Sequence, residues 1–188
     1  MSDASSSKLL GAVLAGGRST RFGSDKAAAL LGGSTLLDHA VAGLAPHVHM
    51  VAICGRIVPG KLSLADRPRP DMGPLGGIAG ALRHAAHHGF DGVLTTGCDM
   101  PVFPTALARA LIGDRPATLI DQPLAGFWPA RLADALDAWL AGDGDRSIRG
   151  WGRHVGAMAV EMPGPALPNV NRVEDLAELA RLRNDGTA

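Results

Sequence analysis

The sequence has little of what several classes of protein require. Among its 188 residues, Lys+Arg and Asp+Glu balance at 18 each, and aromatic residues make up 4%. A nucleic-acid-binding protein usually carries a basic excess and stacks bases on aromatic side chains, so no nucleic-acid partner is expected. No apolar run approaches the roughly 20 residues of a membrane-spanning helix, so no membrane partner is expected either.

Cysteine is also scarce, with Cys54 and Cys98 alone in the sequence. Two cysteines form neither a disulfide framework nor a four-ligand zinc site, and a reducing, cytoplasmic location is the simplest expectation. Residues 1–8 are polar and Ser-rich and lack the apolar core of a signal peptide. We therefore expect a flexible N-terminal tail at residues 1–8 and a single domain at residues 9–188.

Apolar runs alternate with helical patterns along the chain. Strands are expected at residues 8–14, 49–54, 62–65, 92–96, 117–120, 124–128 and 155–162. Helices are expected at residues 34–44, 78–88, 105–111, 131–140 and 174–183, with a Pro/Gly-rich loop at 68–77. This alternation predicts an α/β fold, a three-layer sandwich around a Rossmann-like, mostly parallel sheet.

Polar residues cluster where three of the predicted strands end. Residues 16–26 follow the first strand, Asp66 follows a short strand, and Asp99 follows the strand at 92–96. In open α/β sheets, ligands bind beyond the carboxyl ends of the strands. The three clusters are therefore expected to form one site.

The first cluster suits a triphosphate. Gly16 and Gly17 allow a tight turn whose backbone N–H groups form a concave anion site. Arg18, Arg21 and Lys26 add a local group of cations to a chain that is neutral as a whole. The alternative is a glycine-rich strand exit with solvated cations, and the three cations and the strand context favour phosphate binding.

Two common phosphate-binding motifs do not fit. The glycine-rich loop does not match G-x-G-x-x-G, so a dinucleotide-binding dehydrogenase is not supported. Residues 55–62 approach G-x-x-x-x-G-K-[ST], but Leu62 has no hydroxyl for a metal ion. We interpret this near-match as accidental.

The loop sequence resembles that of a known family. Residues 14–26, LAGGRSTRFGSDK, resemble the signature L-A-G-G-x-S-x-R-[MF]-G-x-D-K of the molybdenum cofactor guanylyltransferases. The resemblance continues, in the family's order, at residues 71–78, 97–101, 122–128 and 169–176. It implies the nucleotide-diphospho-sugar transferase type of fold.

The resemblance also implies a reaction: GMP passes from GTP to the molybdenum-molybdopterin cofactor, giving molybdopterin guanine dinucleotide and pyrophosphate. The implied metal cofactor is Mg²⁺, with Mn²⁺ as an alternative. The implied partners are GTP, the molybdopterin cofactor, and enzymes that synthesise or receive this cofactor.

The family's functional residues transfer by position. The nucleotide would contact Leu14, Ala15, Gly16, Gly17, Lys26, Asp66 and Asp99. Arg21, Lys26 and Asp99 would be catalytic, with Lys26 on the phosphates and Asp99 on the metal ion. Asp66 would contact the guanosine part, and Asn169 and Asn171 would lie near the transferred phosphate or the pterin.

One position departs from the family. Some members carry a nucleotide-binding Asn at the end of the second strand, where this chain has Ile53-Cys54-Gly55. Relatives that use CTP usually have Leu-Ala-Ala-Gly in the loop, so Gly16-Gly17 favours GTP by analogy. The competing hypotheses are a cytidylyltransferase or sugar-phosphate nucleotidyltransferase on the same fold, and a non-enzymatic carrier of GTP or pterin.

Several of these residues have plain structural alternatives. Asp99 is also suited to cap the turn before Pro101, and Asp66 fits a loop turn as well as a ligand contact. Asn171 is a suitable helix cap. Residues 143–153 are either a lid that contacts the pterin phosphate or a surface loop, and the sequence leaves both open.

Overall fold

The computed structural model describes residues 7–16, 25–142, 144–164 and 175. Within these residues the main sheet has seven strands, in the order β5-β4-β1-β6-β8-β7-β9. They are β1 (Leu9–Leu14), β4 (Met50–Cys54), β5 (Ser63–Leu64), β6 (Gly92–Gly97), β7 (Ala117–Leu119), β8 (Gly126–Pro129) and β9 (Met158–Val160). Strand β1 pairs in parallel with both β4 and β6, whereas β8 runs antiparallel to β6 and β7. The predicted mostly parallel sheet is confirmed.

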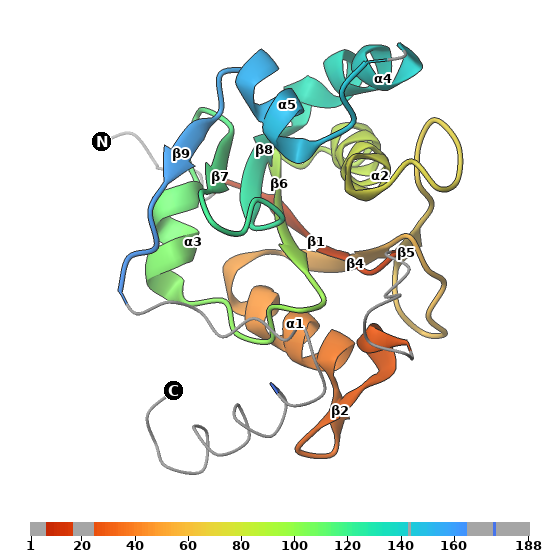
Figure 1. The fold of residues 1–188 in the computed structure, drawn as a ribbon, viewed down its shortest axis with the longest axis vertical. Coiled ribbons are helices and arrows are strands. Elements are labelled where there is room, and N and C mark those ends of the chain that lie inside the picture. Colours follow the sequence, from red (N-terminus) through yellow and green to blue (C-terminus); the bar gives the residue numbers. More distant parts are fainter. Residues whose placement is uncertain (1–6, 17–24, 143, 165–174, 176–188) are drawn as a thin grey trace.

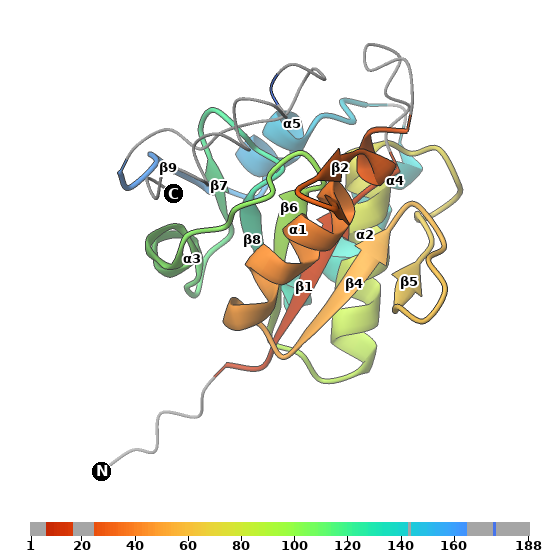
Figure 2. The same cartoon turned by 90° about the horizontal axis from the view of Figure 1, so that it is seen from below.

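Helices cover both faces of this sheet. The helices are α1 (Leu36–Leu44), α2 (Pro74–His87), α3 (Thr105–Leu111), α4 (Ala133–Ala141) and α5 (Ile148–His154). Short 3₁₀ turns are η1 (Lys26–Ala28), η2 (Ala45–His47) and η3 (Ala130–Leu132), and β2 (Leu30–Leu31) pairs with β3 (Ser34–Thr35) in a small hairpin. Helices α1 and α3 lie on one face, and α2, α4 and α5 lie on the other (Figure 1). Figure 2 shows the same three layers from below.

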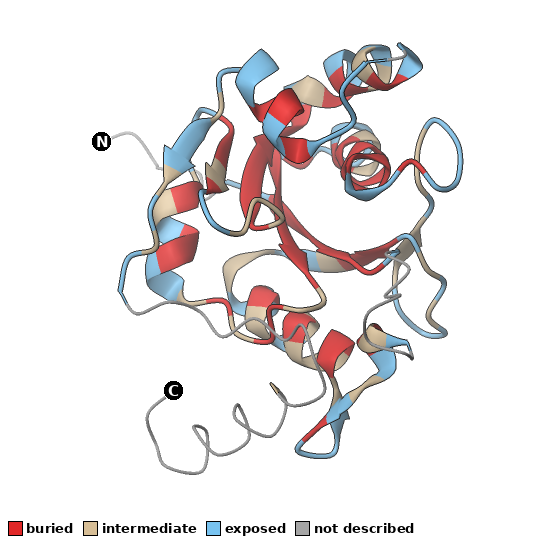
Figure 3. Cartoon of the chain, viewed as in Figure 1, coloured by how far each residue is buried: buried red, intermediate tan, exposed pale blue. Residues whose placement is uncertain are grey.

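The core lies on both sides of β1. Leu10, Ala12 and Leu14 pack in a cluster with α2, while Leu9 and Val13 pack in a second cluster with α1 and α3. Every residue of β1 is buried, as the continuous burial along the centre of the sheet in Figure 3 shows. A central parallel strand is covered on both faces, so its sequence is a continuous apolar run rather than an alternating one.

Two helical segments differ from the sequence prediction. Helix α2 begins at Pro74, so the expected loop at 68–77 is wrong over its last four residues. Gly73 has φ +69° and ends the loop, and Pro74 fills the first helical position, where a missing N–H costs nothing. Helix α5 occupies most of the segment left open as a lid or a surface loop, because Ser147 caps it and Ile148 and Trp151 are buried.

The remaining differences are smaller. Strand β9 spans 158–160 rather than 155–162, because Val155 ends helix α5. The hairpin β2–β3 was not predicted; its turn uses Gly32 and Gly33 at φ +59° and +86°. The expected helix at 174–183 lies outside the described residues except for Asp175. The division into a tail and one domain stays a prediction. In the described part of the chain, no helix is long and apolar enough to cross a membrane.

Candidate functional site

Three strand ends meet at one edge of the sheet. Leu14 at the end of β1 stands opposite Cys54 at the end of β4 and Gly97 at the end of β6. Backbone bonds continue the pairing past these residues: the Ala15 N–H donates to the Cys54 carbonyl at 2.9 Å, and the Cys98 N–H donates to the Leu14 carbonyl at 3.3 Å. The residues that follow each strand are therefore held side by side.

A cavity of about 330 Å³ opens beyond these strand ends. It is lined by Leu14, Gly16, Lys26, Cys54, Asp66, Asp71, Gly73, Pro74, Gly77, Cys98, Asp99 and Leu124. The predicted site residues Leu14, Gly16, Lys26, Asp66 and Asp99 are among them, so the polar clusters do converge. The predicted site does not include Asp71, Gly73, Pro74 or Gly77, although they belong to the 71–78 block that resembles the family.

Lys26 and Asp99 face each other on the cavity wall. Lys26 Nζ lies 3.4 Å from Asp99 Oδ2, and the two side chains are 12% and 22% exposed. Lys26 begins the short turn η1, whose cap is the Asp25 carboxylate; its Oδ1 accepts from the Ala27 N–H at 3.2 Å. The cap fixes the backbone at Lys26 and so limits where its ammonium can reach.

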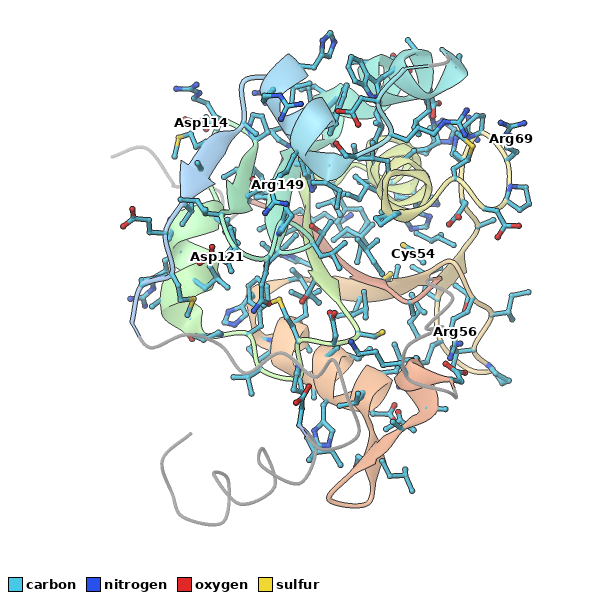
Figure 4. The ribbon with its side chains drawn as sticks, viewed as in Figure 1. Cys54, Arg56, Arg69, Asp114, Asp121 and Arg149 are labelled. Atoms are coloured by element: carbon cyan, nitrogen blue, oxygen red, sulfur yellow. The ribbon has the colours of Figure 1, made fainter. Side chains whose placement is uncertain are left out.

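An ion pair that the sequence did not predict lies beside the turn that carries Lys26. Arg56 Nη2 donates to Asp25 Oδ2 at 2.8 Å, joining the chain after β4 to the start of η1. Arg56 and Cys54 lie at the same end of β4 (Figure 4). The sequence contained one indication of this ion pair, an arginine just after a predicted strand end. Its partner could not be identified from local patterns, because Asp25 lies 31 residues away in the sequence.

Gly16 and Gly55 pass each other with no room for side chains. A Cβ atom on Gly55 would lie 2.6 Å from the Gly16 Cα, and a Cβ on Gly16 would lie 3.0 Å from the Gly55 Cα. Gly55 also has φ +83°, which favours glycine. A side chain at Gly55 would therefore displace the loop at Gly16.

Asp66 projects into the cavity from the loop between β5 and α2. Gly76 of α2 makes room for it, since a Cβ on Gly76 would lie 3.1 Å from the Asp66 Cβ. Burial raises the pKa of Asp66, and the neighbouring charge of Asp71 adds to the rise, whereas a hydrogen bond from the Met72 backbone opposes it.

Residues 11–157 match the MobA-like NTP transferase domain. The chain belongs to this family. The molybdenum cofactor guanylyltransferase of Sinorhizobium fredii is 38% identical over 191 residues, which cover 88% of each chain. Among solved structures, molybdopterin-guanine dinucleotide biosynthesis protein A from Archaeoglobus fulgidus has a TM-score of 0.74 at 20% identity and covers 94% of this chain and 99% of its own. Rv0371C of Mycobacterium tuberculosis, solved as a complex with manganese, has a TM-score of 0.64 at 16% identity, covering 93% and 99%.

Membership of the MobA-like family confirms the resemblance and the fold that it implied. Some of the predicted site residues of this MobA-like domain lie outside the described part of the chain, namely Gly17, Arg21, Asn169 and Asn171. Ala15 is described and is buried against the α1 face, and its N–H is already bonded to Cys54. Contact between Ala15 and a nucleotide would therefore have to use other backbone atoms.

The two thiols of this MobA-like domain line the cavity but are poor nucleophiles. Burial raises the pKa of Cys54 to about 12, and the charge of Asp66 adds to the effect. Burial raises the pKa of Cys98 to about 11, with Asp99 adding and Lys26 opposing. Because the thiolate is the reactive form, both cysteines are inert near neutral pH. Neither thiol is therefore suited to form a covalent enzyme intermediate.

Proposed function

We propose that this chain transfers GMP from GTP to the molybdenum-molybdopterin cofactor, forming molybdopterin guanine dinucleotide and pyrophosphate. The observation that carries the proposal is the convergence of Gly16, Lys26, Asp66 and Asp99 on one cavity at the strand ends of a MobA-like NTP transferase domain. The names of its relatives, at up to 38% identity, supply the acceptor and the base.

The reaction needs alignment and charge neutralisation. An oxygen of the pterin's terminal phosphate attacks the α-phosphorus of GTP, the bond from that phosphorus to the bridging oxygen breaks, and pyrophosphate leaves with the electron pair. Such a step depends on positioning and on electrostatic stabilisation of the phosphates. We assign the triphosphate to the backbone at Gly16 and Gly17 and to the cations of Lys26 and Arg21.

Asp99 is the residue that we assign to a divalent cation, Mg²⁺ or Mn²⁺. It presents a partly exposed carboxylate to the cavity, as an oxygen-seeking cation requires. Among the residues that the structure describes, no group of three or more His, Cys, Asp or Glu side chains could hold a metal ion. This suits Mg²⁺, which is usually bound through one or two carboxylates, waters and substrate phosphates. When bound, the ion would neutralise phosphate charge during transfer.

The other roles follow from position. Asp66 would bind the guanosine part of GTP, and Asn169 and Asn171 would act near the transferred phosphate or the pterin. We further propose that the protein works in the cytoplasm as a single nucleotidyltransferase domain at residues 9–188. Its protein partners would be enzymes that synthesise or receive the cofactor.

The test is pyrophosphate release from the full chain supplied with molybdenum cofactor, Mg²⁺ and one nucleotide at a time. We expect release with GTP and much less with CTP, UTP or ATP, and tighter binding of GTP than of CTP in calorimetry. Faster release with CTP would indicate a cytidylyltransferase. Binding of GTP with no pyrophosphate in the presence of cofactor would indicate a carrier. Either result contradicts the proposal.

A further inference from the structure

The loop that carries Asp66 is tied to helix α4 by a chain of three charged side chains. Arg67 Nη2 and Nε donate to Asp137 at 3.1 and 3.4 Å. Arg83 of α2 donates to the same carboxylate, from Nη2 to Oδ2 at 2.6 Å. We call these residues the Arg67–Asp137–Arg83 chain. It joins the residue next to Asp66 to two helices of the same layer.

The backbone of this loop also lies directly on α2. The Arg67 N–H donates to the Gly76 carbonyl at 3.1 Å. A Cβ atom at Gly80 would collide with the Ala65 carbonyl oxygen. Figure 1 shows the loop running beside α2, and Figure 4 marks its outer part with Arg69. The backbone of residues 65–67 therefore lies against α2, and the Arg67 side chain is bound to Asp137 of α4.

The centre of the Arg67–Asp137–Arg83 chain is partly buried. The Asp137 and Arg83 side chains are 20% and 26% exposed and Arg67 is 44% exposed, whereas Asp134, the second partner of Arg83, is 91% exposed. Burial acts to raise the pKa of Asp137, but the hydrogen bonds from Arg67 and Arg83 outweigh it and the pKa is lowered. The Asp137 carboxylate is therefore ionised near neutral pH, where it pairs with both arginines.

We propose that the Arg67–Asp137–Arg83 chain positions Asp66 for the nucleotide, which makes Asp137 a positioning residue for base selection. The inference rests on the proposed function, because it takes Asp66 as a guanosine contact. Asp66 and Arg67 share a peptide bond, so fixing the Arg67 side chain restricts the Asp66 backbone. A carboxylate ordered before GTP arrives loses less conformational entropy on binding, and this strengthens the preference for the base that it contacts.

The first experiment compares Asp137→Asn with Asp134→Asn, a matched control. Both residues lie on α4 and both contact Arg83, but the described contacts of Asp134 do not include Arg67. For Asp137→Asn we expect a KM for GTP that rises roughly 3- to 10-fold, the scale of coupling within one ion-pair network, with kcat nearly unchanged. The affinity for GTP relative to CTP, measured by calorimetry without acceptor, should fall by a similar factor. Asp134→Asn should match the wild type, and Asp137→Glu should recover part of the loss.

The second experiment separates this inference from the role of Asp66. If the Arg67–Asp137–Arg83 chain acts through Asp66, Asp137→Asn should cause no further change in GTP affinity or base preference in an Asp66→Asn background. If Asp66→Asn alone leaves GTP affinity and base preference unchanged, the proposed role of Asp66 is wrong. If Asp66→Asn alters them while Asp137→Asn behaves like Asp134→Asn, the positioning role is wrong. A lower melting temperature for Asp137→Asn with unchanged KM also overturns it. Arg67→Gln, which leaves the Arg83–Asp137 pair intact, replaces Asp137→Asn should that variant fail to fold.

Discussion

Lys26 Nζ lies 3.4 Å from Asp99 Oδ2 on the wall of the cavity, although the two residues are 73 positions apart in the sequence. One comes from the turn after the glycine-rich loop and the other from the end of β6. The ammonium and the carboxylate neutralise each other at a partly buried position of the cavity wall. A triphosphate offers Lys26 a stronger partner, and a divalent cation offers one to Asp99, so substrate binding should separate the two side chains.

Replacing Lys26 by Ala should slow the chemical step and not merely weaken binding. Negative charge builds on the leaving pyrophosphate, and a fixed ammonium beside it acts more strongly in the transition state than in the ground state. We expect a rate loss of roughly 10²-fold or more in single turnover at saturating GTP, the scale for loss of one preorganised electrostatic contact.

Lys26→Arg is the matched variant, because it keeps the charge but replaces a compact ammonium by a planar fork, and only partial recovery is expected. A wild-type single-turnover rate for Lys26→Ala, with weaker GTP affinity alone, would make Lys26 a binding residue.

Replacing Asp99 by Asn should abolish metal-dependent transfer while the fold persists. The carboxylate faces the cavity rather than the core, so the protein should still fold, with a lower thermal unfolding temperature because the ion pair with Lys26 is lost. The measurement is pyrophosphate release during titration with Mg²⁺ and with Mn²⁺. Asp114→Asn serves as the control, since Asp114 is exposed in the loop between α3 and β7 and does not line the cavity. Normal turnover by folded Asp99→Asn protein would remove Asp99 from the mechanism.

The convergence of these residues was predictable from the sequence because parallel strands end at the same edge. The apolar runs before Gly16 and before Asp99 identify buried strands, and the polar residues after them must then lie close together. The family signature added the order of the blocks and the expected chemistry.

The contacts between distant segments were not predictable. The Arg56–Asp25 pair depends on how the chain after β4 meets η1, and the Gly16–Gly55 approach depends on the register of β1 against β4. Local patterns contain no information on either. Helix α5 was not predicted because its glycines weaken the local helical pattern. The helix is stabilised instead by a contact between distant segments, the packing of Trp151 in the core.

Replacing Asp66 by Asn should stabilise the free protein in a pH-dependent way. Burial raises the pKa of Asp66 above its ordinary 3.8, so the folded state holds the proton more tightly than the unfolded state. The stability that Asp66 contributes is therefore complete below that value and is lost as the pH rises through the folded pKa. Relative to the wild type, the free energy of unfolding of Asp66→Asn should be raised most at pH 7, and this increase should shrink toward pH 4.

Thermal unfolding in the absence of nucleotide measures this effect. Asp71→Asn is the companion variant, because it removes only the neighbouring charge and should give a smaller gain. A gain for Asp66→Asn that is equal at all pH values would show that titration of this carboxyl is not its source.

Replacing Gly55 by Ala should damage nucleotide binding, and Gly60→Ala is the control that isolates the cause. Both glycines have positive φ, +83° and +74°, so both variants carry the cost of about 1–2 kcal/mol for a side chain in the left-handed region. An added Cβ at Gly60 meets nothing within 4 Å, whereas at Gly55 it lies 2.6 Å from the Gly16 Cα. The Gly55 variant must therefore push Gly16 away from its place in the cavity wall.

Overpacking of this kind costs typically 1–3 kcal/mol, and about 1.4 kcal/mol corresponds to a tenfold change in affinity. We expect the two variants to lose comparable stability from backbone strain, with a further loss in Gly55→Ala, and only Gly55→Ala to bind GTP about 10-fold more weakly in calorimetry. Equal GTP affinity in the two variants would mean that the backbone at Gly16 does not hold the triphosphate.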